Sequence, residues 1–262
     1  MTQTTALRGV AAWALSAGLL IGGPTLAATC VAYPSGATTL QIAGQSVALP
    51  VAREIDPCVG VVRQGGVVIV MRGADGLTTT REFREGASFD ASTLGVARPG
   101  KLITAVLTGS FVSRPGSSRG PLAHPEAFGI PVGDILLPTQ ALVVGPSQAL
   151  QASGFSELVV FNQASDAPLL TLALTTAQPA QIPAGLFSPG GRYSWTLRGV
   201  GGAGGSQSGV FQVLSAQRQQ AVTASLATAG NSGLAAQLSH IGLLIDQELT
   251  FDAVQRQASL PR

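Results

Sequence analysis

Charged residues are scarce in this chain of 262 residues: they make up 11% of it, and Lys101 is the only lysine. The 15 Lys and Arg residues nearly balance the 13 Asp and Glu residues. Such a chain lacks the basic surface that attracts nucleic acids and anionic membranes, so we expect no nucleic-acid partner. Glycine and proline are frequent, and 45% of the residues are hydrophobic. This composition is typical of a folded, turn-rich and mainly β protein.

Residues that commonly carry out catalysis are also few. His124 and His240 are the only histidines, and no paired histidines or cysteine cluster provides the several ligands that a metal site needs. In the segment GSQSG, Gln207 stands where the nucleophile motif of serine hydrolases requires serine. We therefore expect no metal site, no cofactor and no enzymatic activity.

After residue 28, no apolar segment is long enough to cross a membrane. Before that point, the apolar residues 10–21 (VAAWALSAGLLI) follow Arg8 and precede the small residues of GGPTLAA. This is the layout of a secretory signal peptide. We predict that residues 1–28 are a signal peptide cleaved near Ala27 or Ala28. The mature protein is then periplasmic or secreted, with no stable membrane insertion.

Cysteine occurs twice, as Cys30 and Cys58. In an exported chain an even pair favours a disulfide, and the chain-entropy model gives a bridge of this loop length roughly 3.5 kcal/mol of stabilisation. The alternative is lipidation of Cys30, because LAATC resembles a lipobox. Thr29 departs from that motif, which has Gly, Ala or Ser before the cysteine.

Residues 29–112 alternate apolar and polar residues between turn signals, which predicts a small β-rich unit. Strands are expected at 40–43, 46–51, 59–63, 67–72 and 78–83. Residues 99–110 combine Pro99 with apolar residues at helical spacing, so we expect a helix there, with a strand as the alternative. The Pro- and Gly-rich segment 113–133 predicts a linker.

Residues 134–214 contain longer strands, expected at 141–144, 157–162, 169–175, 192–198 and 210–214, in a pattern typical of an immunoglobulin-like β-sandwich. Tyr193, Trp195 and Leu197 share one face of their strand and form its predicted core side. The next glycines match G-x-G-x-x-G, but a dinucleotide loop requires a helix after it, and VFQVL predicts a strand. We interpret the glycines as the tip of a β-hairpin.

The strands GRYSWTLRG and SGVFQVL give residues 134–214 a resemblance to bacterial extracytoplasmic immunoglobulin-like sandwich modules. Similar final strands accompany periplasmic regulator-type proteins of the ferric-citrate signalling class. The resemblance covers about a third of the chain and implies a module for binding or assembly rather than catalysis. This sequence has no segment that we assign to a transmembrane signalling helix.

Residues 215–262 predict a helical tail. Ser215 caps a first helix that Gly230 closes, Gly242 stops a second one, and Thr250 caps a third. Apolar residues recur at helical spacing along the first two helices, and we name them the docking stripe: Val222, Leu226, Leu234, Leu238 and Ile241. Two or three short helices do not bury such residues alone, so they must pack on the sandwich, on each other or on a partner.

Together these features favour an exported, non-enzymatic interaction or scaffold protein of the cell envelope, with an envelope protein as its partner. The first alternative is a periplasmic sensory or regulatory protein that acts on a membrane partner. The second is an envelope hydrolase with a site around Glu82, Glu85 and His124. The sequence leaves the oligomeric state open.

Overall fold

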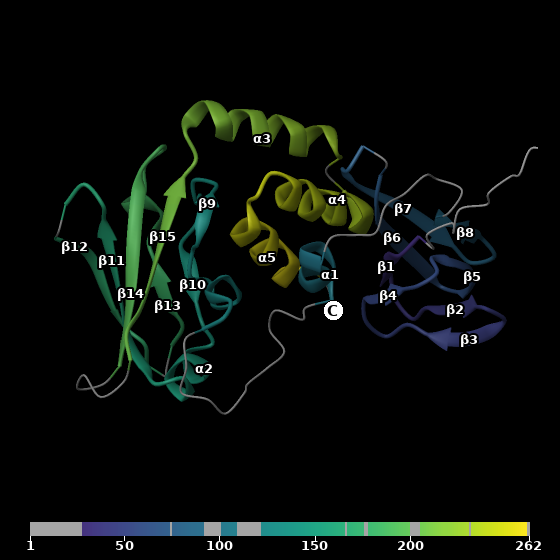
Figure 1. The fold of residues 1–262 in the computed structure, drawn as a ribbon, viewed down its shortest axis with the longest axis horizontal. Helices are drawn as coiled ribbons and strands as arrows, with labels where there is room; N and C mark the ends of the chain where they lie inside the picture. Colours follow the sequence, from purple (N-terminus) through teal and green to yellow (C-terminus); the bar gives the residue numbers. More distant parts are fainter. Residues whose placement is uncertain are drawn as a thin grey trace, which may run out of the picture.

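The computed structural model of the chain describes residues 28–260, apart from 74, 92–100, 109–121, 166, 176–177, 200–204 and 231. The predicted signal peptide up to residue 27 and the glycine-rich tip at 200–204 lie outside the described residues. The described part is mainly β, with several sheets and with helices near the C-terminal end. These helices form a layer between two β-rich units (Figure 1).

The N-terminal β unit consists of two sheets, with the strand orders β4-β1-β6-β7 and β3-β2-β5-β8. Its strands are β1 (Cys30–Pro34), β2 (Thr39–Ile42), β3 (Gln45–Ala48), β4 (Arg53–Ile55), β5 (Val59–Gln64), β6 (Gly66–Arg72), β7 (Thr78–Arg84) and β8 (Ser88–Asp90). The five predicted strands of this region are confirmed as β2, β3, β5, β6 and β7, with shifted ends. The strands β4 and β8 escaped prediction because each has only three residues, and β1 escaped because its buried start, CVA, does not alternate.

Strand β6 is buried on both faces. Val67, Ile69 and Met71 belong to a core that the two sheets of this unit share, whereas Val68 and Val70 belong to a second core that contains the helices. A strand that is covered on both faces appears in the sequence as a continuous apolar run, here VVIVM. The sheet β4-β1-β6-β7 therefore requires a cover on the face that turns away from the other sheet.

The predicted disulfide between Cys30 and Cys58 is confirmed, with 5.5 Å between the two Cα atoms. Both cysteines are buried in the core of the N-terminal unit, and Cys58 N–H donates a hydrogen bond to the carbonyl of Ala28. A sulfur that takes part in this bridge is not available for lipidation. The bridge ties the first strand of the unit to the start of β5.

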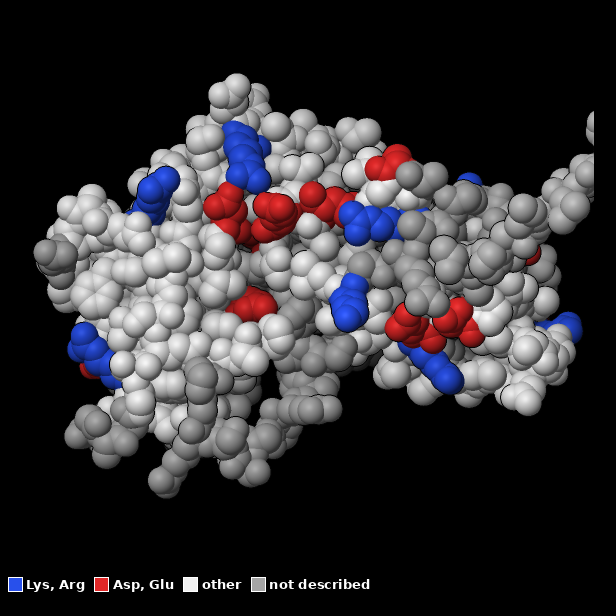
Figure 2. All heavy atoms as spheres, viewed as in Figure 1, with Lys and Arg blue, Asp and Glu red and all other residues white. Residues whose placement is uncertain are grey.

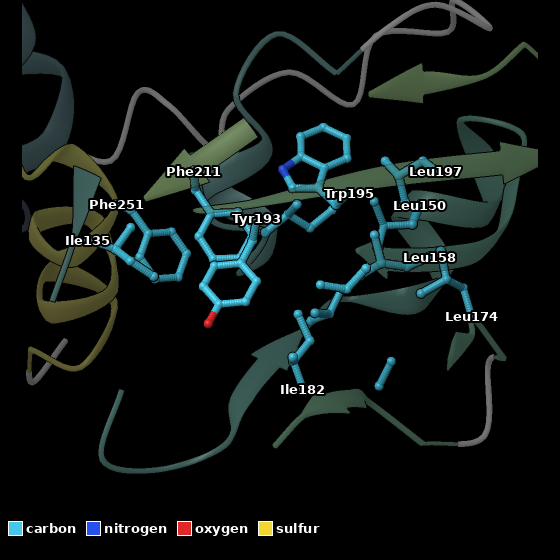
Figure 3. Packing of buried hydrophobic residues seen from close by; sticks show 14 of the residues in the cluster. Ile135, Leu150, Leu158, Leu174, Ile182, Tyr193, Trp195, Leu197, Phe211 and Phe251 are labelled. Carbon is cyan, nitrogen blue, oxygen red and sulfur yellow. The ribbon is translucent and has the colours of Figure 1, made fainter. Parts of the chain in front are cut away.

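The C-terminal β unit contains a five-stranded sheet of the order β12-β11-β14-β15-β9 and a two-stranded sheet, β10-β13. Its elements are η2 (Pro125–Phe128), β9 (Gly133–Ile135), β10 (Leu142–Val144), α2 (Ser147–Ala152), β11 (Phe155–Asn162), β12 (Pro168–Ala173), β13 (Ala180–Ile182), η3 (Ala184–Leu186), β14 (Arg192–Gly199) and β15 (Gln207–Val213). One core joins the two sheets, with Leu158 and Trp195 from the larger and Val144 and Ile182 from the smaller (Figure 3).

The predicted hairpin is confirmed: β14 and β15 pair antiparallel, with Tyr193 opposite Phe211 and Leu197 opposite Gln207. A strand after the glycines contradicts a dinucleotide loop, because a helix is needed there to hold the phosphates. One glycine of this segment has a packing role. A Cβ atom at Gly209 would overlap the indole ring of Trp195, so the ring lies directly on the backbone of β15.

Residues 122–133 of the predicted linker pack onto the C-terminal unit. Ile130 is fully buried in its core, and the Pro131 carbonyl accepts a 2.8 Å hydrogen bond from the Trp195 indole N–H. A buried tryptophan needs such an acceptor for its only polar group. The tryptophan thereby fixes a segment whose composition resembles that of a loose connection.

The helical layer contains α1 (Lys101–Leu107), α3 (Ala216–Thr228), α4 (Gly233–Asp246) and α5 (Thr250–Ala258). Helix α1 confirms a helix within 99–110, and the Ser215 side chain caps α3 as predicted. Helix α4 packs on β6 and β7 of the first unit, whereas α5 packs on β9 and η2 of the second. The expected tail therefore lies in the middle of the molecule, and α3 runs across one side of it (Figure 1).

The prediction that Gly242 ends the second helix is wrong, because α4 continues to Asp246. The glycine is needed for close packing. A Cβ atom at this position would overlap the Thr78 side chain at the start of β7, at 2.6 Å from its Cβ atom. The absence of a side chain lets the helix approach the sheet.

We expect Gly242→Ala to lower the free energy of unfolding by about 1–3 kcal/mol, because the new methyl group forces α4 away from β7. Urea unfolding followed by circular dichroism measures the change. Gly185→Ala is the matched control, since a Cβ atom there meets open space. A G242A protein as stable as the control would contradict this packing.

Candidate functional site

The predicted core side chains Tyr193, Trp195 and Leu197 are all buried. The Tyr193 ring stacks on Phe211 with 5.3 Å between ring centroids, and Phe187 meets it edge-on at 5.0 Å (Figure 3). The Tyr193 hydroxyl accepts a 2.9 Å hydrogen bond from Ser188 N–H. These residues hold the C-terminal β unit together and offer no surface to a ligand.

The docking stripe is used by the chain itself. Val222, Leu238 and Ile241 are buried in the core of the helical layer, and Leu226 and Leu234 are partly buried against it. The same core contains Val31, Val68 and Val70 from the N-terminal sheet. Of the three possibilities for the stripe, packing within the chain is therefore the one observed, and the stripe is not a free docking surface.

Polar side chains of the helical layer bind both β units. Asp246 at the end of α4 accepts a 2.7 Å hydrogen bond from Thr78 N–H, and Asp252 in α5 accepts a 3.0 Å bond from Leu136 N–H. Arg218 in α3 forms an ion pair with Asp134 of β9. Figure 2 shows acidic side chains in a row across the middle of the visible face, over this layer. Asp134, Asp246 and Asp252 thus join the helical layer to the β units.

His240 has a structural role in α4. Its Nε2 atom lies 2.8 Å from the carbonyl of Leu226 in α3, and its Nδ1 atom accepts a hydrogen bond from Arg256 of α5. The side chain thus links three helices.

Asp252 is the ionisable group with the clearest response to its surroundings. Burial raises the pKa of its carboxyl from 3.8 to about 7, although the hydrogen bond from Leu136, a bond from its own backbone N–H and the charge of Arg256 act in the opposite direction. The carboxylate form is therefore costly in the folded protein and is accepted near neutral pH only because these donors surround it.

The edges of the sheets differ in their protection. Edge strands β4, β7, β8 and β9 all contain charged residues, whereas β3, β10 and β13 are uncharged but have at most four residues. Proteins commonly protect edges by charge or by short length, because unpaired backbone groups attract other strands. Strand β12 lacks both of these protections, because its six residues, PLLTLA, carry no charge. Its start is protected differently, by Pro168 and by the bulge next to it.

Strand β12 is exposed on its outer face. Pro168, Leu169, Thr171 and Ala173 are exposed, and 38% of the Leu169 surface is accessible. Leu170 and Leu172 point inward and are partly buried at the margin of the core. Figures 1 and 2 show β12 at one end of the molecule, where the visible surface is mostly uncharged. Among the described strands, β12 is the best candidate for binding another chain.

No family model matches this chain, and no curated protein matches its sequence. Any statement on function therefore depends on the geometry of the site. Across the described ranges, no three His, Cys, Asp or Glu side chains come together as metal ligands. No described helix is both long and apolar enough to cross a membrane.

An open hollow of about 750 Å³ lies on the sheet β3-β2-β5-β8. Its lining includes Gln41, Val59, Val61, Ser88 and Asp90. The Gln41 side chain already accepts a 2.7 Å hydrogen bond from Arg63 Nε. The hollow lacks the enclosed apolar wall with convergent polar groups that is typical of small-molecule sites.

Two residues of the hydrolase alternative, Glu82 and His124, have local partners in different units, and Glu85 follows the end of β7. Glu82 on β7 lies 3.5 Å from Arg84 Nε, and both side chains are exposed, so they form a surface ion pair. His124 precedes η2, and its Nδ1 atom lies 3.1 Å from the carboxylate of Glu126. Glu126 is buried, and sequence reasoning missed it because a lone Glu two residues after a His has no motif.

The raised pKa of Asp252 determines how stability depends on pH. A carboxyl whose pKa is higher in the folded state contributes stability below its unfolded pKa of 3.8, and this contribution is lost as pH rises through about 7. Asp252→Asn keeps an acceptor for Leu136 N–H and removes the charge. We expect the free energy of unfolding of D252N, relative to wild type, to rise by about 3–4 kcal/mol between about pH 4 and pH 8.

Urea unfolding of both proteins across this range measures the difference. Asp75→Asn, at an exposed turn of the N-terminal unit, controls for loss of a carboxylate in general. Wild-type and D252N curves that stay parallel from acid to neutral pH would contradict the cost of burying this charge.

Proposed function

We propose that this chain is an exported, non-enzymatic interaction or scaffold protein of the cell envelope, and that it joins another chain by strand addition at β12. The uncharged edge of β12, which is exposed on its outer face from Leu169 to Ala173, is the observation that carries the proposal. In strand addition, backbone hydrogen bonds provide affinity and alternate side chains provide specificity. The edge of β12 carries no charge that would repel the backbone of a second strand, and its apolar outer face offers side chains for specific contacts.

The rest of the chain supports this use of the edge. Strand β12 belongs to a sheet whose inner face is anchored by Leu158, Trp195 and Phe211, so the edge is presented in a fixed position. The C-terminal helices bury their own apolar residues and therefore do not compete as docking surfaces. The disulfide fits an oxidising compartment, as expected for an exported protein.

An immunoglobulin-like sandwich in residues 134–214 is part of this proposal. Its support is a five-stranded sheet and a two-stranded sheet that share one core, together with the hairpin β14-β15. Such modules commonly serve binding or assembly, which agrees with a role for their free edges.

The test is capture with a tagged mature chain that is produced together with an untagged copy in the envelope of the host. Thr171→Pro removes one N–H from the edge and lies on an edge strand, where proline is tolerated. We expect the tagged T171P chain to capture at least about tenfold less of the partner chain than the tagged wild type does. A tenfold loss of affinity corresponds to about 1.4 kcal/mol of binding free energy.

Val210→Lys is the matched control, because Val210 is 59% exposed on β15 but lies away from the β12 edge. Equal thermal unfolding of wild type and T171P shows that the fold is intact. If T171P retains the same chains in the same amounts as wild type and V210K, strand addition at β12 is wrong.

A further inference from the structure

We infer that the β12 edge is occupied by β12 of a second copy of this chain, antiparallel around a two-fold axis at Thr171. This inference rests on the function proposed above, because it names the occupant of the same edge. The two five-stranded sheets would then join as one continuous sheet. Two-fold pairing of identical surfaces is the commonest form of assembly among soluble proteins.

The hydrogen bonds inside the sheet determine which backbone groups of β12 are available. Leu174 N–H donates to the carbonyl of Ser156, and Ala173 lies opposite Glu157. Because N–H and C=O groups alternate sides along an antiparallel strand, Leu170 and Leu172 also face β11. Thr171 and Ala173 therefore direct their backbone groups to the free edge. Leu169 has no partner at the register shift between Val160 and Phe161, where this alternation is interrupted.

A two-fold axis at Thr171 brings the free backbone groups of Thr171 against their own copy. Thr171 lies opposite Thr171 of the second copy, and the Leu169 side of the strand lies opposite Ala173. The pair at Thr171 exchanges two backbone hydrogen bonds, as hydrogen-bonded antiparallel pairs do. Pro168, which has no N–H to donate, lies outside this ladder, next to the bulge between Val160 and Phe161.

The side chains of β12 complement themselves in this register. On the outer face a large Leu169 meets a small Ala173, and two threonines meet at the axis, a favourable cross-strand pair. On the inner face Leu170 meets Leu172 of the second copy. Both leucines are partly buried at the margin of the core in one chain, so pairing completes their burial and extends the core across the two-fold axis.

Charges do not oppose the pairing. The strand is neutral, and the nearest charged residue opposite it is Glu157 of β11, which forms a 3.5 Å ion pair with Arg198. The two Glu157 residues of the pair would be separated by at least three strand spacings, about 14 Å, which exceeds the screening length of about 8–10 Å. The charged edge strands β4, β7, β8 and β9 lack this neutrality.

The first test is the mass of the oxidised mature protein in solution, by analytical ultracentrifugation over a concentration series up to about 1 mM. We expect a reversible dimer. Thr171→Lys places two like charges opposite each other at the axis and should weaken the dimer by about tenfold or more, whereas V210K should leave it unchanged. Wild type that remains one chain at every concentration overturns the inference.

The second test fixes the register by oxidation of single-cysteine variants. Both native cysteines are already bridged to each other. The added cysteine can therefore form an intermolecular disulfide only with the same added cysteine of the second copy. In T171C the two new side chains lie opposite each other, with about 5.5 Å between Cα atoms, which suits a disulfide. In A173C the new cysteine lies opposite Leu169. We expect a cross-linked dimer from T171C and little from A173C.

Equal cross-linking of both variants, or of neither, overturns the register at Thr171. The two proposals fail separately. If the capture experiment shows that T171P loses a different protein and not the untagged copy, strand addition at β12 stands and self-pairing is wrong. If ultracentrifugation shows a dimer that T171P and T171K both leave intact, strand addition at β12 itself is wrong.

Discussion

Burial of both faces of the sheet β4-β1-β6-β7 is the constraint on which the rest of this structure depends. One face packs on the neighbouring sheet and carries the disulfide, and the other presents Val31, Val68 and Val70. An exposed patch of β-branched residues would be costly in water. Helices α1 and α4 pack on this sheet, so a late part of the chain returns to cover a sheet formed by its first part.

Helix α5, which packs on α4 and α1, covers the C-terminal unit. Phe251 of α5 enters the core of that unit, while Ala253 and Val254 belong to the core of the helical layer. Polar bonds follow the same division: Asp246 binds Thr78 of the first unit, and Asp252 binds Leu136 near β9 of the second. Hydrophobic burial brings the units together, and the directional bonds fix the position of each unit against the helices.

This arrangement decides which surfaces remain for other molecules. Strand β9, at one edge of the five-stranded sheet, is in contact with α5, and β7, at one edge of the N-terminal sheet, is in contact with α4. Strand β12 lies at the opposite edge of its sheet from β9 and is far from the helices (Figure 1). An edge without charge or cover tends to acquire a partner strand, and this tendency is the physical basis of the proposed role.

The sequence by itself determined the local elements and the disulfide. Alternation and turn signals predicted β5, β7, β11 and the hairpin β14-β15, a short apolar run predicted β6, and the Ser215 cap and Gly230 placed α3, because these features depend on neighbours along the chain. The prediction that Thr250 caps the third helix is wrong, because the cap position of α5 is Leu249 and Thr250 is its first residue. Tertiary structure alone decided which apolar residues are covered and which edge is free. The helical spacing predicted the docking stripe but not what covers it. Its partners Val68 and Val70 lie about 150 or more residues earlier in the chain, and a pattern of nearby residues does not predict such a contact. Gly242 was predicted to end a helix, but in the fold it lets α4 pack closely on Thr78. Strand β12 is an edge because β11 pairs with β14 on its other side. Contacts between distant segments leave no periodic signal in the sequence, so neither outcome could be predicted from it.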